Sequence, residues 1–370
     1  MRAAFATRWP TRCSQGIETG VDRSRLEGIF HHLTAYPEGF TPHPKLMRQF
    51  EGRAKTFVET GEVEWATAEA LAIGSLVQQG VPVRLAGEDS RRGTFSQRHA
   101  ALVDYQNENV WIPLSTLPDR RANFWVYDSL LSEYAALGFE YGYAHENHEA
   151  LVMWEAQFGD FVNGAQIIID QYLVAAEDKW GQQNGLVLLL PHGFEGQGPE
   201  HSSARIERFL SLCARNNLRV AVPSSSSQYF HLLRSQARRE RRTPLVAMAP
   251  KSLLRAEATR SPISDFETGS FQEVLDDPGV EDPSMVTRVV LASGKVAHEA
   301  LVQRGRLGEP RQAGQRRAGL LARLAAQVGA GAVDGVGGDA EPHAAPGEVR
   351  GRQHGERRDL GIGPRDDLAD

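Results

Sequence analysis

Short apolar runs alternate with longer helical patterns between residues 81 and 255, and this alternation restricts the fold more than any other feature. The runs are VPVRLAG from residue 81, ALVMWEAQF from 150, GLVLLLP from 185, LRVAVPS from 218 and PLVAMAP from 244. Strands that are apolar along most of their length are buried on both faces. The chain is therefore predicted to be an α/β protein whose parallel sheet is covered by helices on both faces.

Helical patterns fill the intervals between these runs. Residues 64–79 carry apolar side chains at helical spacing before Gly80 and Pro82 end the pattern. The further helices are expected at 133–144, 162–180, 202–217 and 227–242. Loops at the carboxyl ends of parallel strands are where such sheets bind ligands.

Composition divides the chain into segments with different expected structure. Residues 256–285 are polar and contain three prolines, which is typical of a linker. From residue 301 the chain has no Phe, Trp, Tyr or Lys and is rich in Gly, Ala and Arg, so it cannot build a core. The predicted segments are a 1–20 unstructured leader, a 21–60 helical lead-in, the 61–255 α/β domain, a 256–285 linker, the 286–300 start of a truncated carboxyl-terminal domain and a 301–370 low-complexity tail. A reading-frame shift explains the abrupt tail, and a native disordered segment is the alternative.

Charge, cysteine count and hydropathy narrow the class of protein. The net charge of -6 argues against general nucleic-acid binding. Cys13 and Cys213 are too few for a disulfide scaffold or a zinc site. The longest apolar runs have strand length, well short of a membrane span. We expect a cytoplasmic protein with no nucleic-acid or membrane partner.

Two of the four chemically suggestive stretches carry clustered charge or a lone acid. GEDSRRGTFSQRHA, residues 87–100, follows a strand and contains His99, but its spacing alone favours a solvated charge-rich loop. Glu133 stands near the start of a helix made largely of apolar residues. Such a setting raises a carboxyl pKa and suits proton exchange. A helix N-terminal acid stabilised by the helix dipole is the equal alternative.

The other two stretches follow the next strands. In WEAQFGDFVNG, residues 154–164, core packing is the plain interpretation of Phe158 and Phe161. The glycine-rich loop 190–205 contains His192 and His201, which could hold an anion. Ser202 and Ser203 are expected to cap the following helix. HENH, residues 145–148, is interpreted as a turn, and no dinucleotide fingerprint, P-loop or nucleophile elbow occurs.

Long stretches between about residues 19 and 300 carry a family resemblance. They are PEGFTPHPKL, EWATAEALAIGSL, GEDSRRGTFSQRHA, DSLLSEYAALGFEYGYA, MWEAQFGDFVNGAQIIIDQYL, KWGQQNGLVLLLPHGFEGQGPEHSSARIERFLSLCA and PLVAMAPKSLLR. With these residues the chain resembles the thiamine-diphosphate-dependent decarboxylating component of 2-oxoglutarate dehydrogenase, as a partial chain. The Ser-Gln pair in GTFSQRHA, which includes Gln97, is similar to the pair in the branch of this family that is often described as 2-oxoglutarate decarboxylase.

The resemblance implies a thiamine-diphosphate-binding fold with a transketolase-like pyrimidine-binding domain. It implies that Glu133 bonds the aminopyrimidine nitrogen N1′ and so activates the cofactor. It further implies that an aromatic side chain stacks on that ring, with Phe161 the first choice and Phe158 the second. The remaining implied residues are Gln157 for cofactor binding and His201, His99 and His192 for substrate carboxylates and proton transfer.

The resemblance also implies partners and alternatives. Thiamine diphosphate is the expected cofactor, and Mg²⁺ is expected with ligands on a diphosphate-binding module that this chain lacks, so no metal ligand is assigned here. The expected partners are 2-oxoglutarate, dihydrolipoyl succinyltransferase, and either a second copy of the chain or a complementary diphosphate-binding half. Three functions stay open: the succinyl-transferring dehydrogenase component, a stand-alone decarboxylase or carboligase, and an inactive fragment that only dimerises or binds a partner.

Overall fold

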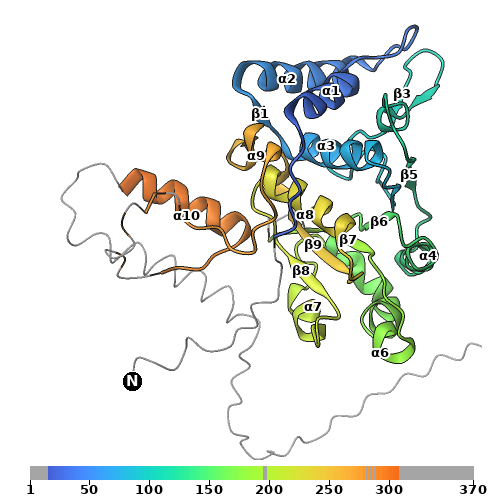
Figure 1. Ribbon diagram of the computed structural model, residues 1–370, viewed down its shortest axis with the longest axis vertical. Coiled ribbons are helices and arrows are strands. Elements are labelled where there is room, and N and C mark those ends of the chain that lie inside the picture. Colours follow the sequence, from blue (N-terminus) through green and yellow to red (C-terminus); the bar gives the residue numbers. More distant parts are fainter. Residues whose placement is uncertain are drawn as a thin grey trace, which may run out of the picture. The chain divides into compact units, whose positions relative to one another are not determined.

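A six-stranded parallel sheet forms the centre of the domain (Figure 1). The computed structural model describes residues 16–194, 198–277, 279–280, 282, 286 and 289–307. In spatial order the strands are β5 (Phe124–Asp128), β2 (Val83–Gly87), β6 (Leu151–Glu155), β7 (Val187–His192), β9 (Leu245–Pro250) and β8 (Arg219–Ala221). Every neighbouring pair is parallel, so the carboxyl ends of all six strands lie at one edge.

Helices cover both faces of this sheet. The α-helices are α1 (Arg23–Thr34), α2 (Pro44–Thr60), α3 (Trp65–Gln78), α4 (Glu133–Glu146), α5 (Gln166–Ile168), α6 (Ala176–Trp180), α7 (Ile206–Leu212), α8 (Ser226–Arg238), α9 (Ser264–Glu267) and α10 (Gly294–Leu307). Short 3₁₀ helices are η1 (Pro113–Ser115), η2 (Gly159–Ala165), η4 (Lys251–Arg255) and η5 (Glu257–Thr259). Two-stranded antiparallel pairs join β1 (Glu62–Val63) to β10 (Ser261–Pro262) and β3 (Leu102–Val103) to β4 (Val110–Trp111).

Alternate side chains of the strands belong to two separate cores. Along β7, Val187 and Leu189 pack into the core that contains α1, α3 and α8, whereas Leu188 and Leu190 pack into the core that contains α4 and α7. This division follows from the two-residue period of a strand. Each fully buried side chain of this size contributes about 1.5–3 kcal/mol by leaving water. The predicted α/β fold with helices on both faces is confirmed.

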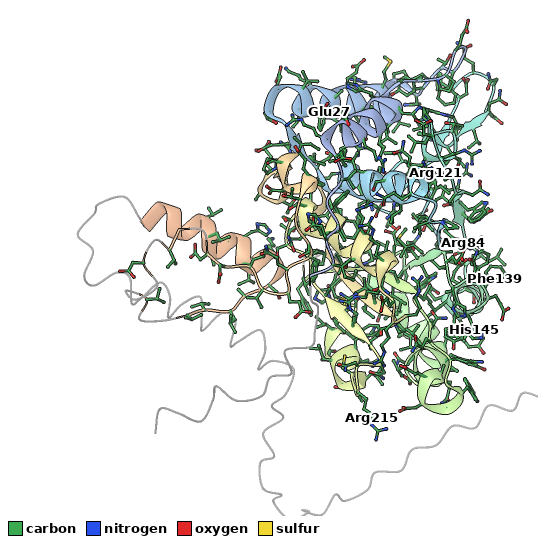
Figure 2. The ribbon with its side chains drawn as sticks, viewed as in Figure 1. Glu27, Arg84, Arg121, Phe139, His145 and Arg215 are labelled. Carbon is green, nitrogen blue, oxygen red and sulfur yellow. The ribbon has the colours of Figure 1, made fainter. Side chains whose placement is uncertain are left out.

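Arg84 joins the sheet to the helix that carries Glu133. Its guanidinium, on β2, makes two hydrogen bonds of 2.7 and 2.8 Å to the buried carboxylate of Glu140 on α4. The same group lies 5.2 Å from the ring centroid of Phe139, and Figure 2 shows the two side chains close together. A bidentate ion pair with aromatic stacking is specific to arginine. We infer that it fixes α4 relative to the strand.

The segment 162–180 is not the single helix that was predicted. It is divided into η2, α5, a π-helical turn, η3 (Ile169–Leu173), and α6. The amide of Val174 donates to the carbonyl of Ile169, which is the wider spacing of a π turn. Ile169 is fully buried and Ile167 is exposed, because residues two positions apart lie on nearly opposite faces of a helix.

β5 is the strand that the alternation pattern did not identify. It lies at the edge of the sheet, and Tyr127 and Asp128 are exposed there. Its first four residues, FWVY, are nevertheless apolar in succession, which was an available signal of a strand.

The predicted leader and linker are both partly wrong. The amide of Thr19 donates to the carbonyl of Gly269, and its hydroxyl lies 2.7 Å from His231 Nδ1. Phe266 is fully buried in the α3–α8 core. Thr19 and the segment 256–271 therefore pack against the domain beside α8. Thr19 does so through hydrogen bonds, and the segment does so through buried apolar side chains such as Phe266.

Some predictions concern residues that the structure does not describe. Residues 1–15 of the leader and 308–370 of the tail lie outside the described residues. At the predicted start of a new unit, the described residues 286 and 289–293 form no strand, and α10 follows them. Within the described part of the chain, no helix is both long and apolar enough to cross a membrane.

Candidate active site

Loops that follow neighbouring strands meet at the carboxyl edge of the sheet, because the strands are parallel. Glu88 and Asp89 follow β2, and Gln157 follows β6. The Gln157 amide donates to Glu88 Oε1 at 3.0 Å and to Asp89 Oδ2 at 3.2 Å, which ties the two loops together. Burial, followed by the charges of Glu133 and Asp89, raises the pKa of Glu88. The predicted residues Gln157 and Glu133 thus lie in one acidic neighbourhood.

Phe158, Phe161 and His201 form an aromatic group beside this acidic pair of loops. The His201 ring meets Phe158 edge to face at a centroid distance of 4.1 Å, and Phe161 lies 6.0 Å from the same imidazole. Phe158 and Phe161 are 5.7 Å apart. Both phenylalanines are only half-buried, so the plain interpretation as core residues is wrong. Their partly open faces can stack against a planar ligand.

Glu133 is the first residue of α4 and is half-buried. Ser132 caps the helix by accepting a hydrogen bond from the amide of Ala135 at 3.2 Å. The preceding Leu130 and Leu131 are 83% and 81% exposed, so apolar surface borders the carboxylate. Gly164 faces it: a Cβ added there would lie 3.6 Å from Glu133 Oε2. The absence of that side chain leaves room beside the carboxylate.

The two histidines of the β7 loop lie at opposite ends of it. His192 Nδ1 accepts a hydrogen bond from the amide of Ala204 at 3.1 Å. The His201 ring donates from Nδ1 to the carbonyl of Pro199 at 2.6 Å. Both rings are half-buried, but the His201 ring packs against the aromatic group, whereas the His192 ring lies 6.3 Å from that of Phe194.

Ser202 and Ser203 do not cap the following helix, contrary to the prediction. Their amides both donate to Asp160 Oδ1, at 3.0 and 2.9 Å. α7 starts only at Ile206, after Arg205 in the left-handed conformation (φ 56°). The buried carboxylate of Asp160, from the β6 loop, therefore binds the backbone amides of the loop that precedes α7.

His99 lies apart from the aromatic group. It lines a cavity of about 40 Å³ whose other walls come largely from α1, α2 and α3. Its ring lies 6.4 Å from Phe50, and its Nε2 has no hydrogen-bond partner among the described residues. Burial, followed by the charge of Arg53, lowers the pKa of His99 to about 4. The structure does not join His99 to His201 and His192 as the resemblance implied.

The neutral state of His99 predicts a pH dependence of stability. The folded pKa is about 4, whereas the unfolded value is about 6.5. The unfolded chain thus binds an extra proton between these pH values, so this contribution is complete above pH ~6.5 and is lost as the pH falls towards ~4. We expect a loss on the order of 2 kcal/mol over this range. In urea titrations at several pH values, the free energy of unfolding of His99→Gln should change less with pH than that of the wild type. The same pH dependence in His99→Gln as in the exposed control His148→Gln would contradict this.

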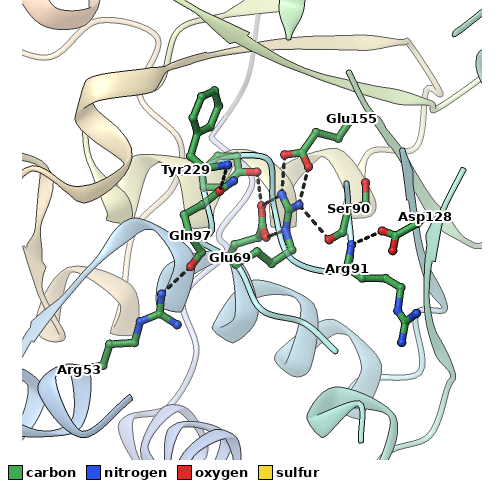
Figure 3. Close-up of polar contacts among 10 residues, drawn as sticks. Arg53, Glu69, Ser90, Arg91, Gln97, Asp128, Glu155 and Tyr229 are labelled. Carbon is green, nitrogen blue, oxygen red and sulfur yellow. Dashed lines mark hydrogen bonds and ion pairs between the residues drawn. The ribbon is translucent and has the colours of Figure 1, made fainter. Parts of the chain in front are cut away.

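A buried ion network lies beneath the β2 and β6 loops (Figure 3). Arg98, 8% exposed, makes hydrogen bonds to both oxygens of Glu69 on α3 and of Glu155 on β6. Tyr229 on α8 donates to Glu69 Oε2 at 2.7 Å, and Arg98 Nη1 donates to the carbonyl of Ser90 at 3.2 Å. Although burial lowers it, the charges of Glu155 and Glu69 raise the pKa of Arg98 well above its usual value. The predicted solvated loop is therefore wrong at Arg98.

Sequence reasoning missed most of this network and the anchors of the His201 loop. Glu155 ends an apolar strand and Glu69 interrupts an apolar helix, and these positions were available signals of buried charge. Asp160 and Lys251 gave no comparable signal. Among the described residues, no group of three or more His, Cys, Asp or Glu is placed to hold a metal ion. In HENH, the ring centroids of His145, in the last turn of α4, and His148, just after it, are 5.6 Å apart.

Comparisons with known proteins give close relatives of this chain. It is 49% identical over 287 residues to the 2-oxoglutarate dehydrogenase E1 component of Shouchella clausii, and 51% identical over 287 residues to the component of that name from Bacillus cereus; each match covers 76% of this chain and 30% of the relative. It is 50% identical over 288 residues to the 2-oxoglutarate dehydrogenase E1/E2 component of Corynebacterium glutamicum, covering 77% of this chain and 24% of the relative. The predicted resemblance is confirmed, and the chain spans less than a third of the length of these relatives.

One domain family also matches. The family described as transketolase, pyrimidine binding domain matches residues 61–257, which is more than half of the chain and includes all six strands of the parallel sheet. The parallel sheet with its loops gathered at the carboxyl edge agrees with this assignment. The chain therefore belongs to the transketolase pyrimidine-binding domain family.

Proposed function

We propose that this chain supplies the aminopyrimidine-binding half of a thiamine diphosphate site in an enzyme that oxidatively decarboxylates 2-oxoglutarate. The succinyl group would pass to the lipoyl arm of dihydrolipoyl succinyltransferase. One observation carries the proposal: identity of 49–51% to three proteins named as 2-oxoglutarate dehydrogenase E1 or E1/E2 components. The site geometry supports it independently.

The residues present fit an aminopyrimidine ring. Phe161 and Phe158 offer half-buried aromatic faces, and Gly164 leaves space beside the Glu133 carboxylate. A carboxyl group at this place can share a proton with a ring nitrogen, here N1′, and thereby activate the adjoining amino group. Thiamine diphosphate supplies the electron sink for decarboxylation when bound.

The neighbouring polar residues have distinct proposed roles. His201 and His192 would bind substrate carboxylates or move protons, because His201 packs against the aromatic group and His192 ends the strand from which the same loop starts. Gln157 would position the ring indirectly, since its amide holds Glu88 and Asp89 in place. We leave His99 out of the proposed site because it lines a separate cavity.

The complete enzyme needs groups beyond this chain's described residues. Mg²⁺ would be held by a diphosphate-binding module, since no described cluster here offers its ligands. We propose either a homodimer or a complement with a separate diphosphate-binding half. The cytoplasmic location expected from composition stays a prediction.

Domain exchange tests the proposal. Residues 61–257 of this chain replace the corresponding segment of the Bacillus cereus E1 component, and 2-oxoglutarate-dependent ferricyanide reduction is measured with thiamine diphosphate and Mg²⁺. We expect the exchanged enzyme to keep at least a tenth of the parent rate, because only half of the site is exchanged. A tenfold loss corresponds to an activation barrier higher by about 1.4 kcal/mol. A folded exchanged enzyme with no activity would contradict the proposal.

Product analysis separates the two enzymatic alternatives. A succinyl-transferring component acylates a lipoyl domain, whereas a stand-alone decarboxylase releases succinic semialdehyde or condenses it with a second aldehyde. The Ser-Gln pair in GTFSQRHA is the feature that keeps the second alternative open; Gln97 Oε1 accepts from the amide of Phe95 at 3.1 Å and shapes this loop. Formation of a succinylated lipoyl domain by the exchanged enzyme would support the succinyl-transferring dehydrogenase function.

A further inference from the structure

Two buried charged side chains, Lys251 and Asp160, hold the loop that carries His201, and neither has a part in the proposed function. Lys251, just after β9, is 6% exposed, and its ammonium group donates to the carbonyl of His201. Asp160, in η2, is 5% exposed, and one oxygen accepts from the amides of Ser202 and Ser203. Burying an ammonium or a carboxylate is costly unless it is well paired. Two such groups on consecutive residues of one loop indicate that its position matters.

Lys251 also lies near the aromatic ring against which the His201 imidazole packs. Its Nζ lies 5.8 Å from the centroid of the Phe158 ring, which is within cation–π range. The same ring meets His201 edge to face at 4.1 Å. The lysine therefore touches both the backbone of His201 and the surface against which the imidazole packs.

The loop needs such anchors because part of it is strained. Glu200 has φ 63° and Arg205 has φ 56°, both in the left-handed region that non-glycine residues rarely adopt. Residues keep such conformations only when the surrounding structure determines them. Lys251 and Asp160 bind the backbone between these two positions.

This backbone geometry decides which imidazole nitrogen carries a proton. The carbonyl of Pro199 can only accept a hydrogen bond, so His201 Nδ1, 2.6 Å away, carries a hydrogen. In the neutral ring the lone pair is then on Nε2. Protonation at Nε2 leaves the bond to Pro199 intact, so the ring can take up and return a proton without moving.

We propose that Lys251 and Asp160 are positioning residues that hold residues 199–203 in place so that neutral His201 presents the Nε2 lone pair to the substrate. The substrate-facing part rests on the proposed function. The positioning part is independent of it, because the tautomer of His201 exists without substrate. Lys251 fixes the carbonyl end of His201, and Asp160 fixes the next two amides.

Histidine-selective ¹⁵N NMR of the full 370-residue chain tests the positioning. Long-range ¹H–¹⁵N spectra distinguish the two tautomers, and His201→Gln identifies the signal. We expect the wild-type ring to be mainly protonated at Nδ1, and Lys251→Met to lower that population at least twofold. Lys251→Arg, which keeps a buried donor, should restore it. Lys179→Met is the matched control, since Lys179 is exposed on α6, where its ammonium group bonds Gln171 and lies over the Trp180 ring, away from the His201 loop.

A second variant covers the case in which Lys251→Met fails to fold. Asp160→Asn keeps the shape and one acceptor oxygen but loses the charge, and it should also lower the Nδ1-protonated population. Folded variants, checked by circular dichroism, that keep the wild-type tautomer would overturn the proposal.

Kinetics of the exchanged enzyme separate positioning from the proposed function. We expect Lys251→Met to lower kcat about 10- to 100-fold with KM changed less than about threefold, because a small misplacement of a reacting group affects the transition state most. Lys251→Arg should recover most of kcat. A changed tautomer with unchanged kcat would refute the role of His201 in the reaction while leaving its positioning by Lys251 intact.

Discussion

Replacing Arg98 with methionine is expected to lower the free energy of unfolding by about 3–5 kcal/mol. The guanidinium is the shared partner of Glu69 and Glu155, and all three side chains are less than 9% exposed. Its removal leaves two carboxylates buried without a cation, and burial, with the charges of Glu69 and Asp89, raises the pKa of Glu155 even while Arg98 is beside it. Urea titration followed by circular dichroism measures the loss.

Arg92 provides the matched control for this change. Its side chain is 53% exposed and forms one ion pair with Asp89 at 3.2 Å, so Arg92→Met should cost less than about 1 kcal/mol. Adding Glu155→Gln to Arg98→Met should regain part of the loss, because one uncompensated charge is removed. Equal losses in the Arg98 and Arg92 variants would mean that the buried network does not stabilise the domain.

Replacing Glu133 with glutamine is expected to lower kcat of the exchanged enzyme by about 10²- to 10⁴-fold. Glutamine has nearly the same shape and can fill the space beside Gly164, but it cannot take or give the proton that N1′ requires. Substrate binding should change far less, since Glu133 is proposed to act on the cofactor. Steady-state ferricyanide assays give kcat and KM separately.

Glu146 is the appropriate control for the Glu133 variant. It is the last residue of the same helix and is exposed, so Glu146→Gln should leave kcat within about twofold. If Glu133→Gln keeps more than about a tenth of the parent kcat, another group must activate the cofactor.

The central sheet could be predicted because burial on both faces leaves a local signal. GLVLLLP and PLVAMAP are apolar at nearly every position, and they became β7 and β9. β5 was missed although its first four residues, FWVY, form an apolar run of the same kind. The π turn at Ile169–Leu173 also escaped, because nothing local distinguishes an extra residue per turn from a regular helix.

The candidate site was predictable only in part, for a different reason. Glu133, Phe158, Phe161 and His201 lie in long stretches that carry the family resemblance. The partners that hold the site are set by tertiary contacts: Arg98 meets Glu155 57 positions away in the chain. Lys251 meets the His201 loop 50 positions away. Spacing within a motif contains no information on pairs of this kind.

The structure of the exchanged enzyme with thiamine diphosphate and Mg²⁺ bound would test the central claim most directly. We predict that the aminopyrimidine N1′ lies within about 3 Å of a Glu133 carboxylate oxygen. We also predict that the ring stacks on Phe161 or, failing that, on Phe158. A ring bound away from Glu133, or a Glu133 carboxylate turned towards solvent with the cofactor in place, would contradict the account.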